Sequence, residues 1–327
     1  MGRKVTCRGK IAVNVFIPTV NQMAFLFSLI VIGYILSKFN IVPKNAAGVL
    51  AKLENTIFIP GLVLGTFIQH FTMERIGTAW KLFLGSFIIM IVIIPLAILV
   101  SKLCAKDKYT QKIYTYGLSF SNFGFMGNAI VSTIFPDIFL EYLIFTLPLW
   151  ILIYMWGVPS LLISDGSKQT FGQKVKSFVN PMFICMIIGM VIGILNVPIP
   201  SWATSVITTA GNCMSPIAML LTGMTVAAIS LKKVFTNVGV WAVTVVRLAI
   251  FPLIFIGIFA LIPLPKSFDT FVICAICSLA MPLGLNTIVI PSAYGRDTTV
   301  ASSMALVSHL MSCISIPLIF MLLMKIV

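Results

Sequence analysis

The sequence predicts an all-α membrane protein with ten transmembrane helices, arranged as two inverted repeats of five helices in which helices 4 and 9 are broken and cross. Three observations support this prediction. Hydrophobic residues make up 59% of the 327 residues and charged residues 9%, so a water-soluble domain would expose large apolar patches. The apolar residues form about ten runs long enough to cross a bilayer. Prolines and asparagines of the first half recur at nearly constant spacing in the second half.

The apolar runs define the expected helices, each close to the roughly 20 residues that a transmembrane helix needs. In order they cover residues 12–38, 46–69, 79–102, 110–134, 138–164, 177–197, 202–230, 237–263, 268–291 and 298–325. The first run is too long, and too weakly flanked by a cleavage site, for a removable signal peptide, so we expect it to be retained. The longest polar stretch, Asp165 to Lys176, is a loop.

Basic residues are distributed unequally between the loops, which predicts the topology. The formal net charge is +14, and most of the basic residues follow predicted helices 1, 3, 5, 7 and 9. Those loops hold Lys38, Lys44, Lys52, Lys102, Lys106, Lys108, Lys112, Lys168, Lys174, Lys176, Lys232, Lys233 and Arg296. The opposite side holds Arg75, Lys81, Lys266 and Lys325. Because positive charge marks the cytoplasmic side of a cell membrane, we expect both termini outside, against one contrary signal from the basic residues before Ile11. The charge follows topology, so no nucleic-acid partner is expected.

Seven cysteines are scattered and predict neither a disulfide framework nor a metal site. They are Cys7, Cys104, Cys185, Cys213, Cys274, Cys277 and Cys313. Cys274 and Cys277 form a C-x-x-C pair, which elsewhere would indicate zinc or redox chemistry, but here the pair lies in an apolar run without further ligands. We expect no metal and no cofactor.

Matching residues in the two halves predict an internal repeat. Four pairs lie 156 to 158 residues apart, namely Pro60 and Pro216, Pro95 and Pro252, Asn128 and Asn286, and Pro159 and Pro317. A weaker pair, Gly33 and Gly193, lies 160 apart. The repeats are then residues 1–165, with helices 1 to 5, and residues 166–327, with helices 6 to 10. Because five is odd, the second copy must enter the membrane from the other side, which is typical of secondary transporters.

Polar and helix-breaking residues fall near the middle of predicted helices 4 and 9. The candidate binding residues there are Ser119, Ser121, Asn122, Asn128, Pro282, Gly284, Asn286 and Thr287. A broken helix inside a bilayer requires protein or water to satisfy its freed backbone groups, and its half-helix ends can receive a carboxylate or a cation. The alternative is that these residues only permit tight helix packing.

Three segments resemble the auxin efflux carrier family of permeases, which includes plant PIN-type carriers and bacterial malate and malonate carriers. They are residues 118–128, 282–289 and 308–317. The resemblance implies a fold similar to that of bile acid:sodium symporters, with helices 1, 2, 6 and 7 as a scaffold and helices 3–5 and 8–10 as a mobile transport domain that works as an elevator. It also implies a homodimer through the scaffold, and it places Trp150 and Tyr154 near the cavity. Gly61-x-x-x-Gly65 and Gly189-x-x-x-Gly193 could support close helix contact.

Three further residues could carry charge or protons inside the membrane. Glu54 either couples transport to an ion or is solvated near the cytoplasmic interface beside Lys52. Arg247 either counters an anionic substrate or pairs with a helix break, or else it snorkels to the interface or satisfies backbone carbonyl groups. His309 either titrates during transport or only forms hydrogen bonds.

These observations favour a secondary carrier for a small organic anion, driven by H⁺, by Na⁺ or by exchange. A carboxylate is the expected substrate, because two side-chain amides and the freed amides of the broken helices suit it. A membrane sensor, a receptor or a channel could retain the same fold. An enzyme is not expected, because the sequence lacks H-E-x-x-H, G-x-S-x-G and clustered aspartates, and no catalytic residue is predicted.

Overall fold

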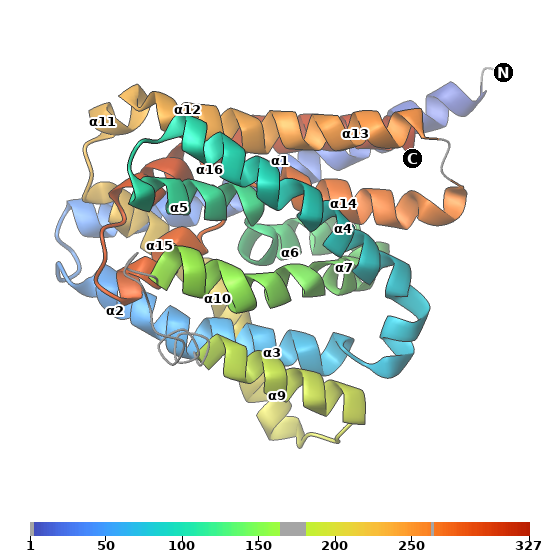
Figure 1. Ribbon diagram of the computed structural model, residues 1–327, viewed down its shortest axis with the longest axis horizontal. Coiled ribbons are helices and arrows are strands. Elements are labelled where there is room, and N and C mark those ends of the chain that lie inside the picture. Colours follow the sequence, from blue (N-terminus) through green and yellow to red (C-terminus); the bar gives the residue numbers. More distant parts are fainter. Residues whose placement is uncertain (1–2, 164–180, 263–264) are drawn as a thin grey trace.

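The computed structural model describes residues 3–163, 181–262 and 265–327, and this part of the chain is built from helices (Figure 1). The α-helices are α1 (Arg3–Lys38), α2 (Ala46–Leu53), α3 (Ile59–His70), α4 (Met73–Cys104), α5 (Lys108–Ser119), α6 (Asn128–Ile134), α7 (Phe139–Leu152), α9 (Pro181–Leu195), α10 (Ser201–Ala227), α11 (Leu231–Thr236), α12 (Val238–Val245), α13 (Phe251–Leu261), α14 (Asp269–Ala280), α15 (Asn286–Ala293) and α16 (Thr299–Ile326). Wider π-helical stretches are η1 (Glu54–Phe58), η2 (Phe123–Gly127), η4 (Ile153–Ile163) and η5 (Val246–Ile250). Short 3₁₀ turns are η3 (Pro136–Ile138) and η6 (Lys266–Phe268). The described residues form no β-strand beyond one isolated bridge, so the all-α prediction is confirmed.

Seven helical stretches of the described chain are long and apolar enough to cross a membrane. They are Phe16–Lys38, Ala46–His70, Ala79–Cys104, Pro136–Ile163, Ser201–Ala227, Val238–Leu261 and Thr299–Ile326. Predicted helices 4 and 9 do not meet this length criterion because each is broken near its middle. Predicted helix 6 begins at residue 177, outside the described residues, as do the predicted polar loop and the predicted repeat boundary. The number of ten spans therefore stays a prediction.

Two helix boundaries differ from the sequence expectation. α4 begins at Met73, six residues before the predicted start, but Ala79 has non-helical angles (φ −108°, ψ 19°), so a kink lies where the apolar run begins. The predicted polar link between helices 7 and 8 contains a short additional helix, α11. In both places residues outside the apolar run form a short helical segment of their own, which hydropathy does not indicate.

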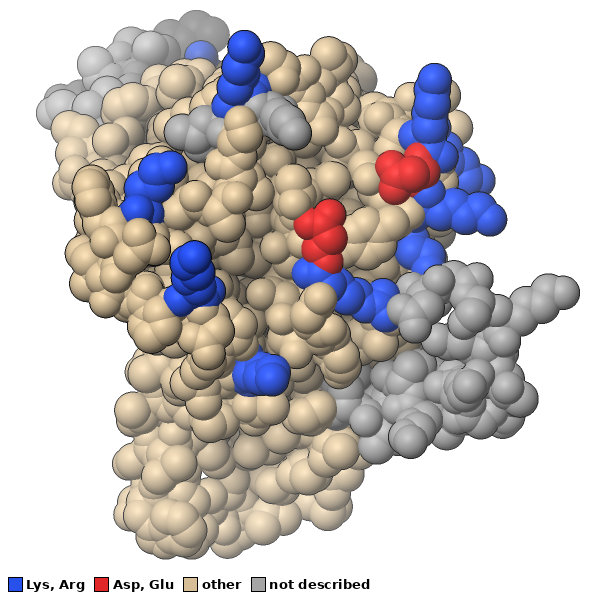
Figure 2. Space-filling model, turned by 90° about the vertical axis from the view of Figure 1, so that its left-hand side faces the viewer, with Lys and Arg blue, Asp and Glu red and all other residues tan. Residues whose placement is uncertain are grey.

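The charged loops gather at one end of the molecule. The links from α1 to α2, from α4 to α5, from α10 to α11 and from α15 to α16 lie at this end, whereas α1 begins and α16 ends at the other (Figure 1). Figure 2 shows the first end, where lysine and arginine outnumber the acidic residues. At this end Asp107 caps α5 by accepting the N–H of Thr110 at 2.7 Å, which holds the pKa of that carboxyl below its usual range. We call this end the basic face.

Glycines allow close contact between helices from the two halves. A Cβ at Gly33 of α1 would clash with the carbonyl of Leu220 in α10. A Cβ at Gly193 of α9 would lie 2.6 Å from the carbonyl oxygen of Phe67 in α3. Gly33 and Gly193 are the weaker repeat pair of the sequence, and each packs against a helix of the opposite half. Both G-x-x-x-G motifs are likewise used within one chain, because Gly61 faces α10 and Gly189 faces α3.

Candidate functional site

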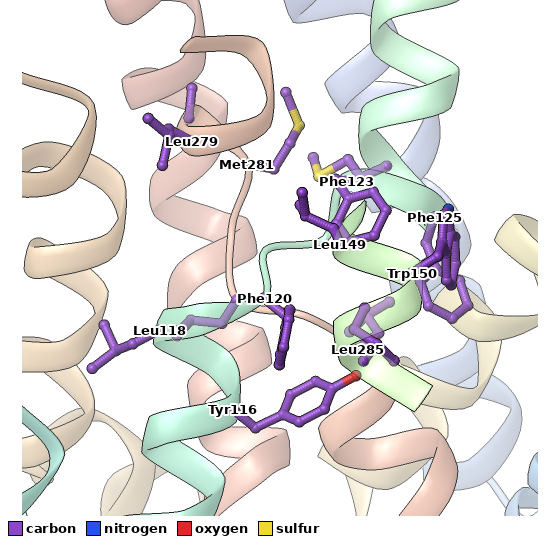
Figure 3. Packing of buried hydrophobic residues seen from close by; sticks show 14 of the residues in the cluster. Tyr116, Leu118, Phe120, Phe123, Phe125, Leu149, Trp150, Leu279, Met281 and Leu285 are labelled. Atoms are coloured by element: carbon purple, nitrogen blue, oxygen red, sulfur yellow. The ribbon is translucent and has the colours of Figure 1, made fainter. Parts of the chain in front are cut away.

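The two predicted breaks meet and cross at the centre of the molecule. α5 ends at Ser119 and the chain continues in an extended conformation before η2 and α6, while α14 ends at Ala280 and the chain continues to α15. Ser121 and Leu283 form an antiparallel bridge between the two extended segments. The N–H of Asn122 donates to the carbonyl of Pro282 at 2.8 Å, and the N–H of Gly284 donates to the carbonyl of Phe120 at 3.2 Å. Figure 3 shows the segments crossing among buried apolar side chains.

Proline and glycine have distinct roles at this crossing. Pro282 has no N–H but supplies a carbonyl acceptor, so its position in the bridge loses no hydrogen bond. Gly284 lies so close to the opposing segment that a Cβ there would stand 2.6 Å from the carbonyl oxygen of Phe120. The side chain of Thr287 donates back to the carbonyl of Gly284 at 2.8 Å and so fixes the start of α15. These residues hold the two segments in contact.

Arg247 binds the backbone of both broken helices. Its Nε donates to the carbonyl of Met281 at 3.2 Å, and its two terminal nitrogens donate to Leu118 at 2.9 Å and to Ser278 at 3.1 Å. The side chain is 1% exposed. The last carbonyls of a helix have no intrahelical donor and carry partial negative charge, so a guanidinium is well suited to the ends of α5 and α14. Among the roles that the sequence left open for Arg247, these contacts match hydrogen bonding to backbone carbonyl groups.

His309 and Asn122 form a buried hydrogen-bonded pair. The Nδ1 of His309 lies 2.8 Å from the carbonyl of Ala305, and its Nε2 lies 2.9 Å from the side-chain nitrogen of Asn122. A carbonyl can only accept, so Nδ1 carries the hydrogen and Nε2 of the neutral ring accepts from the amide. This arrangement matches a hydrogen-bonding histidine. A separate side-chain contact joins the two broken helices directly: the hydroxyl of Ser121 donates to the carbonyl of Ser278 at 2.7 Å.

Several oxygens around the crossing have no hydrogen-bond partner among the described residues. The side-chain nitrogen of Asn286 donates to the hydroxyl of Tyr116 at 2.9 Å, but its oxygen is unpartnered. The other unpartnered oxygens near the crossing belong to Ser119, Asn122, Asn128 and Tyr154. Buried polar atoms are normally satisfied in proteins, so groups left open beside a cavity are candidates for binding water or a ligand.

Trp150 and Tyr154 are buried within the protein rather than facing lipid. Their rings stack at 5.8 Å with an interplanar angle of 13°, and Trp150 also meets Phe123 edge-on at 4.9 Å. Gly124 leaves room for this indole, because a Cβ there would lie 2.6 Å from the ring. The stacked rings of Trp150 and Tyr154 therefore pack against the first residues of η2, Phe123 and Gly124.

Five of the predicted binding residues line one of two cavities. Ser121, Gly284, Asn286 and Trp150 line a cavity of about 10 Å³ at the crossing, which is room for about one water. Asn128 instead lines a cleft of about 400 Å³ between α3 and α10 on one side and η2, α6 and α7 on the other. We call this the central cleft. Its lining includes the last turn of α3 and the start of α7, so it faces the end opposite the basic face (Figure 1).

Most polar residues of the central cleft were not predicted from the sequence. They are Thr66, Gln69, His70, Ser132, Thr208, Asn212 and Ser215. A signal was present, because Thr208, Asn212 and Ser215 have the i, i+4, i+7 spacing of one helix face within an apolar run. Ser215 also reaches across the cleft, where its hydroxyl donates to the carbonyl of Phe125 at 2.6 Å.

Glu54 lies in η1 and is 0% exposed, with both carboxyl oxygens unpartnered among the described residues. In this structure the carboxyl of Glu54 is therefore buried within the protein. Lys52, two residues earlier, is exposed, and the oxygens of Glu54 have no hydrogen-bond partner among the described residues. η1 is followed by Pro60, just as η5 with Arg247 is followed by Pro252. A proline leaves the carbonyl four residues before it without a donor and can widen the helix there.

The cysteines whose side chains the structure describes, which exclude Cys7, are unbonded, including the buried C-x-x-C pair at Cys274 and Cys277. Within the same residues, no group of three or more histidine, cysteine or acidic side chains could hold a metal ion.

A helical chain with several membrane-spanning segments and two broken helices crossing beside a polar cleft defines a polytopic membrane protein of the transporter class. The family model described as membrane transport protein matches residues 18–170 and matches a second time over residues 167–320. The chain belongs to this family, to which the auxin efflux carriers also belong. The double match agrees with two related halves. No curated protein matches the chain.

Proposed function

We propose that this membrane transporter is a secondary carrier for a small organic anion, with carboxylates as the substrate class. The supporting observation is that two half-helices begin at the crossing, one of them beside the central cleft. The η2 and α6 helix runs for twelve residues from Phe123 to Ile134, and α15 starts at Asn286. The first amides of a helix have no intrahelical acceptor and carry partial positive charge, so such starts favour an anion.

The composition of the central cleft supports an anionic ligand. None of the residues that line it is acidic, and its polar side chains are amides, hydroxyls and one histidine. Asn128 is the predicted residue in this lining, and its amide nitrogen can donate to a carboxylate while its unpartnered oxygen can accept from a hydroxyl. A short hydroxylated dicarboxylate uses both capacities, and an unsubstituted dicarboxylate uses the amide donor.

We infer an elevator mechanism with two inverted repeats. α1, α2 with α3, α9 and α10 form the scaffold, and the remaining helices form the transport domain that carries the crossing. Support comes from two close helix contacts made at glycines, α1 with α10 at Gly33 and α9 with α3 at Gly193. These two glycines are a repeat pair in the sequence, so equivalent positions make equivalent contacts in the two halves. With the basic face in the cytoplasm, both ends of the chain lie outside, and the central cleft opens outward. The scaffold is also the proposed homodimer surface.

Replacing Asn128 by alanine should reduce uptake of labelled malonate or malate into proteoliposomes. A lost hydrogen bond to a charged group is worth about 1.5–3 kcal/mol, so we expect a loss of roughly tenfold to a hundredfold in uptake at low substrate concentration. Asn45→Ala is the matched control, because Asn45 is exposed at the start of α2 and its side chain makes no cap hydrogen bond. Saturable uptake that is equal in both variants would refute the site. If the wild type transports no carboxylate under H⁺, Na⁺ or exchange conditions, the substrate class is wrong.

A further inference from the structure

Glu54 is a buried acid that the proposed anion site does not use. Its carboxyl is 0% exposed and neither oxygen has a partner among the described residues. An ionised carboxylate that is closed off from bulk solvent and contacts no described donor is very costly, whereas the neutral acid costs far less. In this conformation the carboxyl must therefore hold a proton.

Elements from both proposed domains pack against η1, which carries Glu54. η1 packs against α9 and α10 of the scaffold and against α15, which starts at the crossing. From η4, Tyr154 lies within electrostatic range of Glu54, and its own hydroxyl is unpartnered. Glu54 thus lies at the seam between the part that is proposed to move and the part that is not.

The titratable groups around Glu54 are few and none is a buried base. η4 contributes Tyr154, α9 contributes Cys185 and α10 contributes Cys213, while α15 has no titratable side chain. On the same continuous helix, Lys52 is exposed and His70 lies at the far end of α3. No described cation can therefore replace the proton, and a partner for an ionised Glu54 would have to come from solvent.

The position of Glu54 along its helix connects protonation with access. The central cleft lies at the end of α3 away from the basic face, whereas Glu54 follows α2, which begins at the basic face (Figure 1). In this conformation the cleft reaches the surface, since Ser132 and Asn212 are exposed, while the seam over Glu54 is closed. A movement of α15 and η4 that opened the seam would bring water to the carboxyl.

We propose that Glu54 is the proton-coupling site of this transporter: it holds a proton while the cleft is open to the outside and releases it to cytoplasmic water when the seam opens. The step breaks the O–H bond of the acid, leaves the electron pair on the carboxylate and transfers the proton to water. This inference rests on the proposed function, since it assigns the coupling ion of the same transport cycle.

Glu54→Gln tests the proposal, because glutamine has the size of the protonated acid but cannot release a proton. In proteoliposomes, we expect accumulation of labelled malonate driven by a pH gradient to fall at least about tenfold, while exchange of labelled for unlabelled malonate at equal pH is retained. Glu74→Gln, at an exposed glutamate in the first turn of α4, is the matched control and should change neither assay. Retained exchange also demonstrates that the Gln variant is folded.

Three results would overturn the proposal: pH-driven accumulation unchanged in Glu54→Gln, loss of exchange together with accumulation, or accumulation driven by Na⁺ and not by H⁺.

A second measurement separates this proposal from the substrate assignment. Infrared spectra of the purified protein at neutral pH should show a protonated carboxyl band that is lost in Glu54→Gln and kept in Glu74→Gln. Absence of this band in the wild type refutes the coupling site whatever is transported, whereas the band without carboxylate transport refutes only the proposed substrate.

Discussion

Replacing Arg247 by glutamine should abolish transport and strongly destabilise the protein. The guanidinium satisfies three buried carbonyls at the ends of α5 and α14, and glutamine cannot reach or satisfy all three. The carbonyl of Ser278 still accepts from the hydroxyl of Ser121, but the carbonyls of Leu118 and Met281 lose the guanidinium. Each buried acceptor left unpaired costs about 1–3 kcal/mol, so the melting temperature in detergent should fall clearly. The measurement is thermal unfolding followed by size-exclusion chromatography, together with malonate uptake.

Arg247→Lys separates charge from geometry in the same experiment. Lysine keeps the positive charge but lacks the planar fork that donates in three directions, so it should restore only part of the stability. If Arg247→Gln melts and transports like the wild type, the guanidinium does not hold the crossing together.

Replacing Gly284 by alanine should separate the two crossing segments. The added methyl group would lie 2.6 Å from the carbonyl oxygen of Phe120, and backbone cannot give way cheaply there. Overpacking of this kind costs about 1–3 kcal/mol, and here the strain falls on the bridge that aligns the half-helices. We expect malonate uptake to fall at least about tenfold at equal protein incorporation, because alignment of the half-helix starts is lost.

Gly257→Ala is the matched control for this substitution. Gly257 lies in α13 with no atom within 4 Å of an added Cβ, so alanine there should leave uptake unchanged and be neutral or slightly stabilising. Equal uptake by the two variants would contradict the role assigned to Gly284.

The crossing was predictable from sequence because the signals are local. Pro282, Gly284 and the paired asparagines cannot be accommodated in two continuous apolar helices without a cost, so the breaks could be located to within a few residues. The partners of Arg247 could not be predicted in the same way. All three are backbone carbonyls, which every residue has, and only the tertiary arrangement decides which of them lie within reach.

The central cleft and the burial of Glu54 depend on helix rotation and depth, which hydropathy does not specify. Asn128 was identified from its repeat partner Asn286, yet the structure places the two in different cavities, since only Asn128 is on the side that faces α3 and α10. For Glu54, the neighbouring Lys52 suggested solvation at the interface. Side chains within one helix turn can point in different directions, so Lys52 can be exposed while Glu54 is buried. Which of them is buried depends on how α10 and α15 pack against η1.

The most direct test of a carboxylate site in the central cleft is substrate protection of a single cysteine. Ser132→Cys, introduced after replacement of the native cysteines, places a thiol in the exposed lining of the cleft, and Ser201→Cys places one at the exposed start of α10 outside it. We predict that malonate slows modification of Cys at position 132 in a saturable manner and leaves position 201 unaffected. Equal modification rates at position 132 with and without saturating, transported malonate would contradict a carboxylate site in this cleft.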